Sequence, residues 1–178
     1  ILELDEIDRL FIFPSGGDES LPMGAALQCQ VDMEFEETSP LGPIYLGDEY
    51  EDDKIEIELK KWGSEILYKK IDDIHTHVGS ELNNGKIIAR YFGRMEWGAR
   101  SLGNRSIIAD GRKPNVVQRI NEAIKNRDFW MPFAPSVLFE RVNDYFENPK
   151  DYFGPYMVIA FPSKPLALLV HQSSTSLS

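Results

Sequence analysis

The sequence has only one cysteine, Cys29, and no long uncharged hydrophobic run. One cysteine can form neither an internal disulfide bond nor a multi-cysteine metal site, so a reducing, cytoplasmic location is expected. No stretch approaches the roughly 18 apolar residues that a membrane helix needs, so no membrane association is expected. The first six residues also lack the basic start and apolar core of a secretory signal peptide.

Positive charge is scarce overall, because 19 Lys and Arg face 29 Asp and Glu in 178 residues, a formal net charge of −10. This balance argues against general nucleic-acid binding. The charge is unevenly distributed: residues 1–60 hold 3 basic and 17 acidic residues, whereas residues 86–127 hold 10 basic and 3 acidic residues. Any affinity for small anions is therefore expected in the segment 86–127.

The hydrophobic fraction of 42% and the charged fraction of 27% are those of a folded globular chain. Periodicity and turn residues predict a mixture of helices and strands. The predicted helices cover 22–30, 52–62, 71–82, 114–124 and 138–146, and the predicted strands cover 10–13, 86–92, 105–109 and 156–161. Residues 31–53 are acidic and contain Pro and Gly, which is typical of a linker or an extended segment.

Three glycines and three arginines share the 14 positions from Gly93 to Ser106. Glycine permits close backbone approach, and the guanidinium fork matches phosphate and carboxylate oxygens. Burial of several unpaired guanidinium groups costs several kcal/mol each, roughly, so these side chains are solvated, paired or held for an anionic ligand. Glu96 can neutralise only one of them. Composition alone favours an anion site and a solvated loop about equally.

A second cluster spans residues 121–136 and combines Lys125 and Arg127 with a stiff loop of Trp, Pro and Phe residues. Cations at the end of a helix interact favourably with its dipole, which is one explanation for Lys125 and Arg127. The apolar loop fits either a pocket wall or ordinary packing.

Both clusters resemble the C-terminal domain of O-carbamoyltransferases of the nodulation-factor and antibiotic-tailoring type. The first motif is Gly-Arg-Met-Glu-Trp-Gly-Ala-Arg-Ser-Leu-Gly-Asn-Arg-Ser, and the second is Asn-x-x-Ile-Lys-x-Arg followed by Pro-Phe-Ala-Pro-Ser. Residues 10–30 resemble the end of the family's N-terminal domain, which belongs to the actin-like, sugar-kinase superfamily. The resemblance covers almost the whole chain.

The resemblance implies an α+β fold, with a YrdC-like open twisted mixed sheet and flanking helices after a short α/β remnant. It divides the chain into an N-terminal remnant (1–35), a linker (36–53) and a YrdC-like domain (54–178). It also implies that carbamoyl phosphate and ATP, with Mg²⁺ as a candidate metal, give carbamoyl adenylate. The N-terminal domain, which holds Fe(II), would then pass the carbamoyl group to a hydroxyl acceptor.

The same resemblance assigns roles to individual residues. Catalytic roles are expected for Lys125, Arg94 and Arg105, and Asp18 matches a metal-binding carboxylate of the N-terminal domain. The residues expected to bind substrate or nucleotide, or to orient an arginine in the case of Glu96, are Arg100, Asn104, Ser106, Glu96 and Arg127.

The chain departs from the family pattern at three places. The histidines of the metal site do not occur ahead of Asp18, and Glu19 and Ser20 replace the glycines expected after it. The late His-x-Asp-Gly-Thr-x-Arg element survives only faintly in residues 171–177. We therefore expect a truncated, catalytically incomplete carbamoyltransferase, or alternatively an inactive module that binds nucleotide or carbamoyl phosphate. Exposed apolar residues within 1–30 make a homodimer a further expectation.

Overall fold

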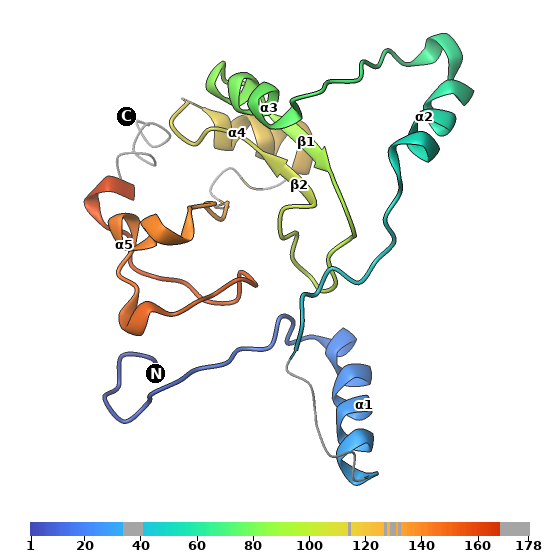
Figure 1. Cartoon of the computed structure of the whole chain (residues 1–178). Helices are drawn as coiled ribbons and strands as arrows, with labels where there is room; N and C mark the ends of the chain where they lie inside the picture. The colour runs from blue at the N-terminus through green and yellow to red at the C-terminus, as the bar shows by residue number, and fades with distance from the viewer. Residues whose placement is uncertain (34–40, 114, 127, 129–130, 132, 168–178) are drawn as a thin grey trace. The chain divides into compact units, whose positions relative to one another are not determined.

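A computed structural model of the chain describes residues 1–33, 41–113, 115–126, 128, 131 and 133–167. These residues form helices and a small antiparallel sheet, which is an α+β arrangement (Figure 1). The α-helices are α1 (Leu21–Asp32), α2 (Asp52–Lys61), α3 (Ile74–Asn83), α4 (Val116–Ile120) and α5 (Val142–Tyr145). The short turns are η1 (Asp18–Ser20), η2 (Gly63–Glu65), η3 (Asn121–Lys125), η4 (Phe139–Arg141) and η5 (Pro149–Asp151). The strands are β1 (Ile88–Tyr91) and β2 (Arg105–Ile108).

Backbone contacts divide the chain into two compact units. The first unit comprises 1–12, 78–88 and 107–178, and the second comprises 13–77 and 89–106. The second unit contains the arginine-rich segment that follows β1.

The ends of α2 and α3 follow from their sequences. In α2, Asp52 and Asp53 lie in the first turn and Lys60 in the last, so both ends complement the helix dipole. At the start of α3, the Asp73 carboxylate accepts the backbone N–H of Thr76 at 3.1 Å. After α3, Gly85 adopts φ +81°, a left-handed conformation that stops a helix. The predictions of these two helices are therefore confirmed.

Two of the four predicted strands are confirmed, and two are wrong. The residues of β1 and β2 pair with each other, whereas residues 10–13 and 156–161 belong to no ladder. Met157 adopts φ +56°, which is incompatible with a regular strand. The pairing near this point is instead a single bridge between Phe146 and Ser163. The larger YrdC-like sheet therefore stays an expectation, because the described residues show two paired strands.

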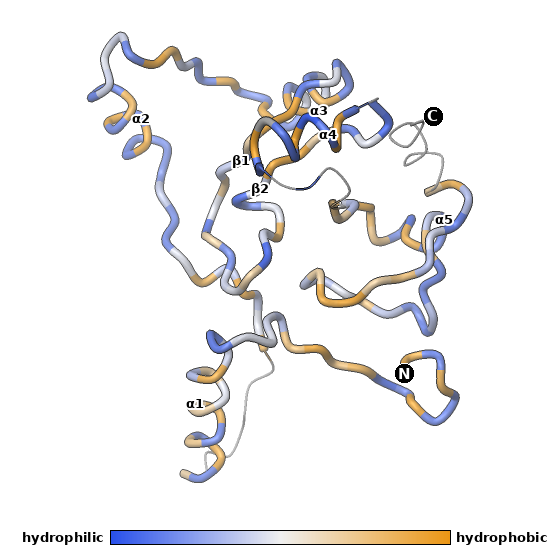
Figure 2. The backbone as a smooth tube through the Cα atoms, turned by 180° about the vertical axis from the view of Figure 1, so that it is seen from behind, coloured by the Kyte–Doolittle hydropathy of each residue, from blue (hydrophilic) through white to orange (hydrophobic). Residues whose placement is uncertain are grey.

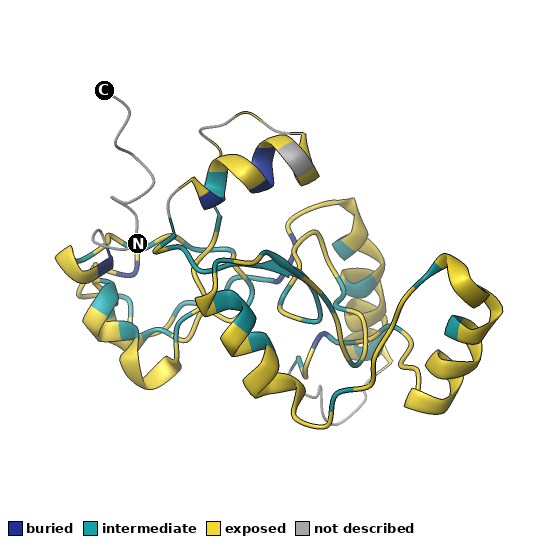
Figure 3. Cartoon of the chain, turned by 90° about the horizontal axis from the view of Figure 1, so that it is seen from above, coloured by how far each residue is buried: buried dark blue, intermediate teal, exposed yellow. Residues whose placement is uncertain are grey.

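Most of the described residues are exposed or only partly buried (Figure 3). The buried apolar residues of the described chain are Leu2, Ile44, Val116, Ile120 and Ala167. Helix α1 carries hydrophobic residues along its length (Figure 2), yet none of its residues is buried. In the part of the chain described, no helix is both long and apolar enough to cross a bilayer.

Candidate functional site

The arginine-rich loop is paired with a segment that the sequence assigns to a linker. Tyr45 and Glu96 form an antiparallel bridge. The N–H of Gly47 donates to the carbonyl of Met95 at 3.0 Å, and the N–H of Trp97 donates to the carbonyl of Ile44 at 2.7 Å. Ile44 is only 2% exposed. Residues 44–47, which we call the strap, are thus ordered backbone within the same unit as the loop.

The Glu96 carboxylate organises the loop through backbone groups. Its Oε1 atom accepts the N–H groups of Leu102 at 2.9 Å, Asn104 at 2.6 Å and Arg105 at 3.1 Å. Burial raises the pKa of Glu96, but hydrogen bonds from its own backbone and from these three N–H groups outweigh burial, so the pKa lies below its ordinary value. Glu96 was expected to orient an arginine side chain, and the contact that it makes is with the backbone of Arg105.

Two arginines that were expected to have catalytic roles donate side-chain hydrogen bonds to backbone carbonyls. Arg94 donates from Nε to the carbonyl of Gly47 at 2.9 Å, which joins the loop to the strap. Arg105 donates from Nη1 to the carbonyl of Phe92 at 2.7 Å and from Nη2 to that of Gly93 at 2.9 Å. The Arg105 guanidinium also lies 3.5 Å from the centre of the Tyr91 ring. Both side chains therefore shape the loop in this structure.

The remaining polar groups of the loop form a compact set. The hydroxyls of Ser101 and Ser106 lie 2.6 Å apart, and the Ser106 hydroxyl accepts the N–H of Gly103 at 3.0 Å. The Asn104 side chain donates to the carbonyl of Arg94 at 2.8 Å. Arg100 is exposed. Sequence reasoning did not single out Ser101, although its position five residues before Ser106 was visible in the motif.

Lys125 lies in the other unit and is exposed at the end of η3, which is a single π-helical turn. Such turns are frequent at functional sites. In this turn Asn121 is fully buried, and its amide donates to the carbonyl of Met131 at 3.2 Å. Arg127, which was expected to bind substrate, lies outside the described residues.

Arg112 is engaged by a neighbouring acid. Its Nη2 atom lies 2.8 Å from Oδ2 of Asp110. The side-chain hydrogen bond from Arg112 is the main reason that the pKa of Asp110 is below its ordinary value. Asp110 in turn raises the pKa of Arg112. The ion pair thus occupies part of the Arg112 guanidinium.

Asp18, the expected metal ligand, lies in η1. Among the described residues, no group of three His, Cys, Asp or Glu side chains is arranged to hold a metal ion. A single carboxylate does not form a metal site by itself, so no chemistry through a metal can be derived from these residues.

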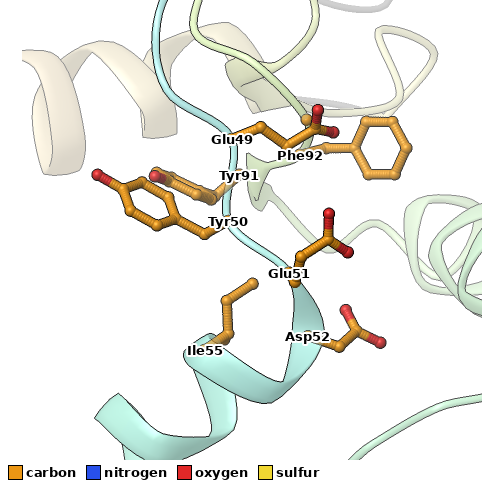
Figure 4. Close-up of a pocket in the computed structure, with 8 residues that line it drawn as sticks. Glu49, Tyr50, Glu51, Asp52, Ile55, Tyr91 and Phe92 are labelled. Carbon is orange, nitrogen blue, oxygen red and sulfur yellow. The ribbon is translucent and has the colours of Figure 1, made fainter.

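A concave site of about 220 Å³ lies beside the loop and the start of α2 (Figure 4). Its walls combine carboxylates with aromatic rings. The acidic residues are Glu49, Glu51 and Asp52, and the aromatic residues are Tyr50, Tyr91 and Phe92. Three carboxylates repel phosphate, so this concavity is a poor site for the triphosphate of a nucleotide.

The family described as carbamoyltransferase C-terminus matches residues 79–175, more than half of the chain. The chain is 40% identical to an uncharacterized protein of Methanocaldococcus jannaschii over 170 residues, which are 92% of this chain and 27% of that protein. It is 36% identical to the nodulation protein NolO of Bradyrhizobium diazoefficiens over 146 residues, which are 80% of this chain and 26% of NolO.

A third similar protein is the 3'-hydroxymethylcephem-O-carbamoyltransferase of Amycolatopsis lactamdurans, 27% identical over 156 residues, which are 88% of this chain and 28% of that enzyme. The chain thus spans about a quarter of the length of these curated relatives. The match over residues 79–175 includes the second half of α3, both strands and the whole arginine-rich loop, so this chain belongs to the carbamoyltransferase family and corresponds to its C-terminal region.

Proposed function

We propose that this chain supplies the phosphate-recognising part of a carbamoyltransferase that forms carbamoyl adenylate from ATP and carbamoyl phosphate. The observation that carries the proposal is the loop from Gly93 to Ser106. It gathers guanidinium, hydroxyl and amide donors within one unit of a chain that belongs to this family. Recognition of phosphorylated reactants depends mainly on such positioned donors.

Within the loop, Arg100 is the first candidate for direct contact with a phosphate. Its guanidinium makes no hydrogen bond or ion pair with other described residues, whereas Arg94 and Arg105 each hold backbone carbonyls. Five N–H donors remain available for a bidentate contact. Arg94 and Arg105 stay proposed as catalytic groups, since neither uses all of its donors.

Three further residues receive proposed roles, each within its own unit. Asn104 and Ser106 are proposed to bind substrate from the same loop, and Lys125 is proposed to provide an ammonium group for a phosphate. For Lys125 the support is its place in the Asn-x-x-Ile-Lys motif and its exposure. Asp18, Fe(II) and Mg²⁺ remain proposals from the family resemblance.

The acceptor is proposed to be a hydroxyl group. One relative is named for a hydroxymethyl-bearing cephem, which is a hydroxyl acceptor of this kind. The chain covers about a quarter of that enzyme's length. Choice of acceptor is therefore proposed to involve parts of the protein beyond those aligned with this chain.

Calorimetry with the whole chain tests the proposal. We expect ATP and carbamoyl phosphate to bind, and Arg100→Ala to weaken both by about tenfold, the loss of one strong charge-assisted contact. Glu58→Gln on α2 is the matched surface control. Lack of affinity for either ligand, in a chain shown to be folded by circular dichroism, would exclude the proposed site.

A second candidate is a binding module without turnover. It is favoured by the internal engagement of Arg94 and Arg105, whose guanidinium groups are partly occupied by carbonyls. Formation of carbamoyl adenylate from these reactants consumes one water and must release pyrophosphate from ATP and orthophosphate from carbamoyl phosphate. Measurement of both products separates the candidates, because a binding module releases neither.

A further inference from the structure

Glu96 lies between two backbone segments that are distant in sequence. On one side, its own backbone is bridged to Tyr45 of the strap. On the other side, its carboxylate accepts the N–H groups of Leu102, Asn104 and Arg105. Glu96 therefore links the strap to residues 102–105, so that the strap restrains the backbone of these residues.

One oxygen that accepts three N–H groups is a strong restraint. Hydrogen bonds to an ionised acceptor contribute about 1.5–3 kcal/mol each, more than neutral ones. Without the carboxylate, three closely spaced N–H groups would have to find water or another anion. The backbone of residues 102–105 would then no longer be held in its present conformation.

The groups proposed to meet phosphate are attached to this same backbone. Arg100 and Ser101 immediately precede the residues that Glu96 holds, and Ser106 immediately follows them. Ser101 also donates to the carbonyl of Arg105 at 2.6 Å, so its hydroxyl is tied to a residue that Glu96 fixes. A change in the path of residues 102–105 would therefore move both hydroxyls.

We infer that Glu96 is a positioning residue for phosphate recognition, an internal anion that presets residues 100–106 before a phosphorylated ligand binds. This inference rests on the proposed function. Glu96 does not itself contact the ligand, because a carboxylate repels phosphate and its Oε1 atom is already occupied by three donors. Its contribution is a reduced ordering cost for the loop when the ligand binds.

The test compares Glu96→Gln and Glu96→Ala with the unchanged chain, using ATP and carbamoyl phosphate as probes in calorimetry. Glu96→Ala removes the acceptor, and we expect about a tenfold loss of affinity for both probes. Glu96→Gln keeps a carbonyl acceptor without the charge, so we expect a partial rescue, with a loss of about threefold. Glu58→Gln makes the same change of charge on an exposed helix face and should bind as the unchanged chain does.

Amide hydrogen exchange supplies a readout that general destabilisation would not reproduce. We expect faster exchange at residues 102, 104 and 105 in both Glu96 variants, with unchanged protection in α3. Equal affinity in all variants, or uniformly faster exchange without rescue by glutamine, would overturn the inference and leave the proposed function standing. If the unchanged chain binds neither probe, the proposed function is excluded, and the inference that depends on it is excluded too.

Discussion

The backbone nitrogen of Asn104 lies 2.6 Å from the Oε1 atom of Glu96. The same oxygen accepts two further N–H groups from this loop, which gives the only acid of the segment 93–106 a structural partner in the backbone. The Glu96 carboxylate is therefore stabilised by hydrogen bonds from peptide groups.

Glu96 should make stability depend on pH. Its pKa is lowered in the folded chain, so its contribution is fully present above the unfolded-state value of about 4.3 and is lost as the pH falls through the folded value. As the pH falls below about 4.3, we expect the urea midpoint of the unchanged chain to fall more steeply than that of Glu96→Gln. Glu58→Gln should keep the steep acid dependence. Identical slopes for Glu96→Gln and the unchanged chain would contradict this role.

Arg105 and Arg100 should respond differently to the same substitution. A lysine side chain at position 105 lacks the forked guanidinium that donates to the carbonyls of Phe92 and Gly93. Its ammonium group also stacks less well on the Tyr91 ring. Arg105→Lys should therefore lower the free energy of unfolding by about 1–2 kcal/mol. Arg100→Lys should leave stability within about 0.5 kcal/mol and weaken ATP binding. Urea unfolding and calorimetry of both variants check this. Equal loss of stability in the two would mean that the carbonyl contacts of Arg105 contribute little.

Gly47→Ala should weaken the pairing between strap and loop. A Cβ atom at Gly47 would lie 2.6 Å from Cβ of Met95, too close for the backbone to accommodate without moving. We expect a loss of about 1–3 kcal/mol in the free energy of unfolding. Gly42→Ala is the matched control, because nothing lies within 4 Å of its Cβ position. If the Gly47 variant is as stable as the Gly42 variant, the strap accommodates the added methyl group without a loss in the free energy of unfolding.

Gly79→Ala should stabilise α3. Gly79 lies inside the helix, and an added Cβ atom there meets nothing within 4 Å. Alanine in a helix interior is favoured over glycine by about 1 kcal/mol, so thermal unfolding should shift upward by a few degrees. At Gly85, where φ is +81°, alanine should instead lower the unfolding temperature. Scanning calorimetry of both variants measures the two unfolding temperatures. Shifts in the same direction would contradict the prediction that local backbone preference determines the stability at each position.

The sequence predicted those parts of the fold that depend on local pattern. Helix α2 has acids at its start and lysines at its end, and α3 ends at an Asn-Gly pair, so both were predicted close to their observed bounds. The run 10–13 is apolar enough for a strand, but a strand also needs a pairing partner, which composition does not reveal. For the same reason the pairing of Ile44 with Trp97 was not predicted from an acidic segment containing Pro and Gly.

The candidate site was predictable in its location and less so in its internal contacts. The motif of arginines and glycines identified the loop because such residue types suit anion recognition. It did not reveal that Glu96 would hold N–H groups, since every residue except proline carries this donor and the sequence has no signal for it. The carbonyls held by Arg94 and Arg105 are invisible in the sequence for the same reason.

The strap also fixes when the loop can form during folding. Arg94 and its partner Gly47 are 47 residues apart along the chain, and a ring of that size closes only at an entropic cost that helices such as α2 do not bear. During synthesis, residues 44–47 therefore remain without their partners in the loop until the arginines have been added to the chain. The contact between Arg94 and Gly47 can therefore form only after all the residues between them have been synthesised.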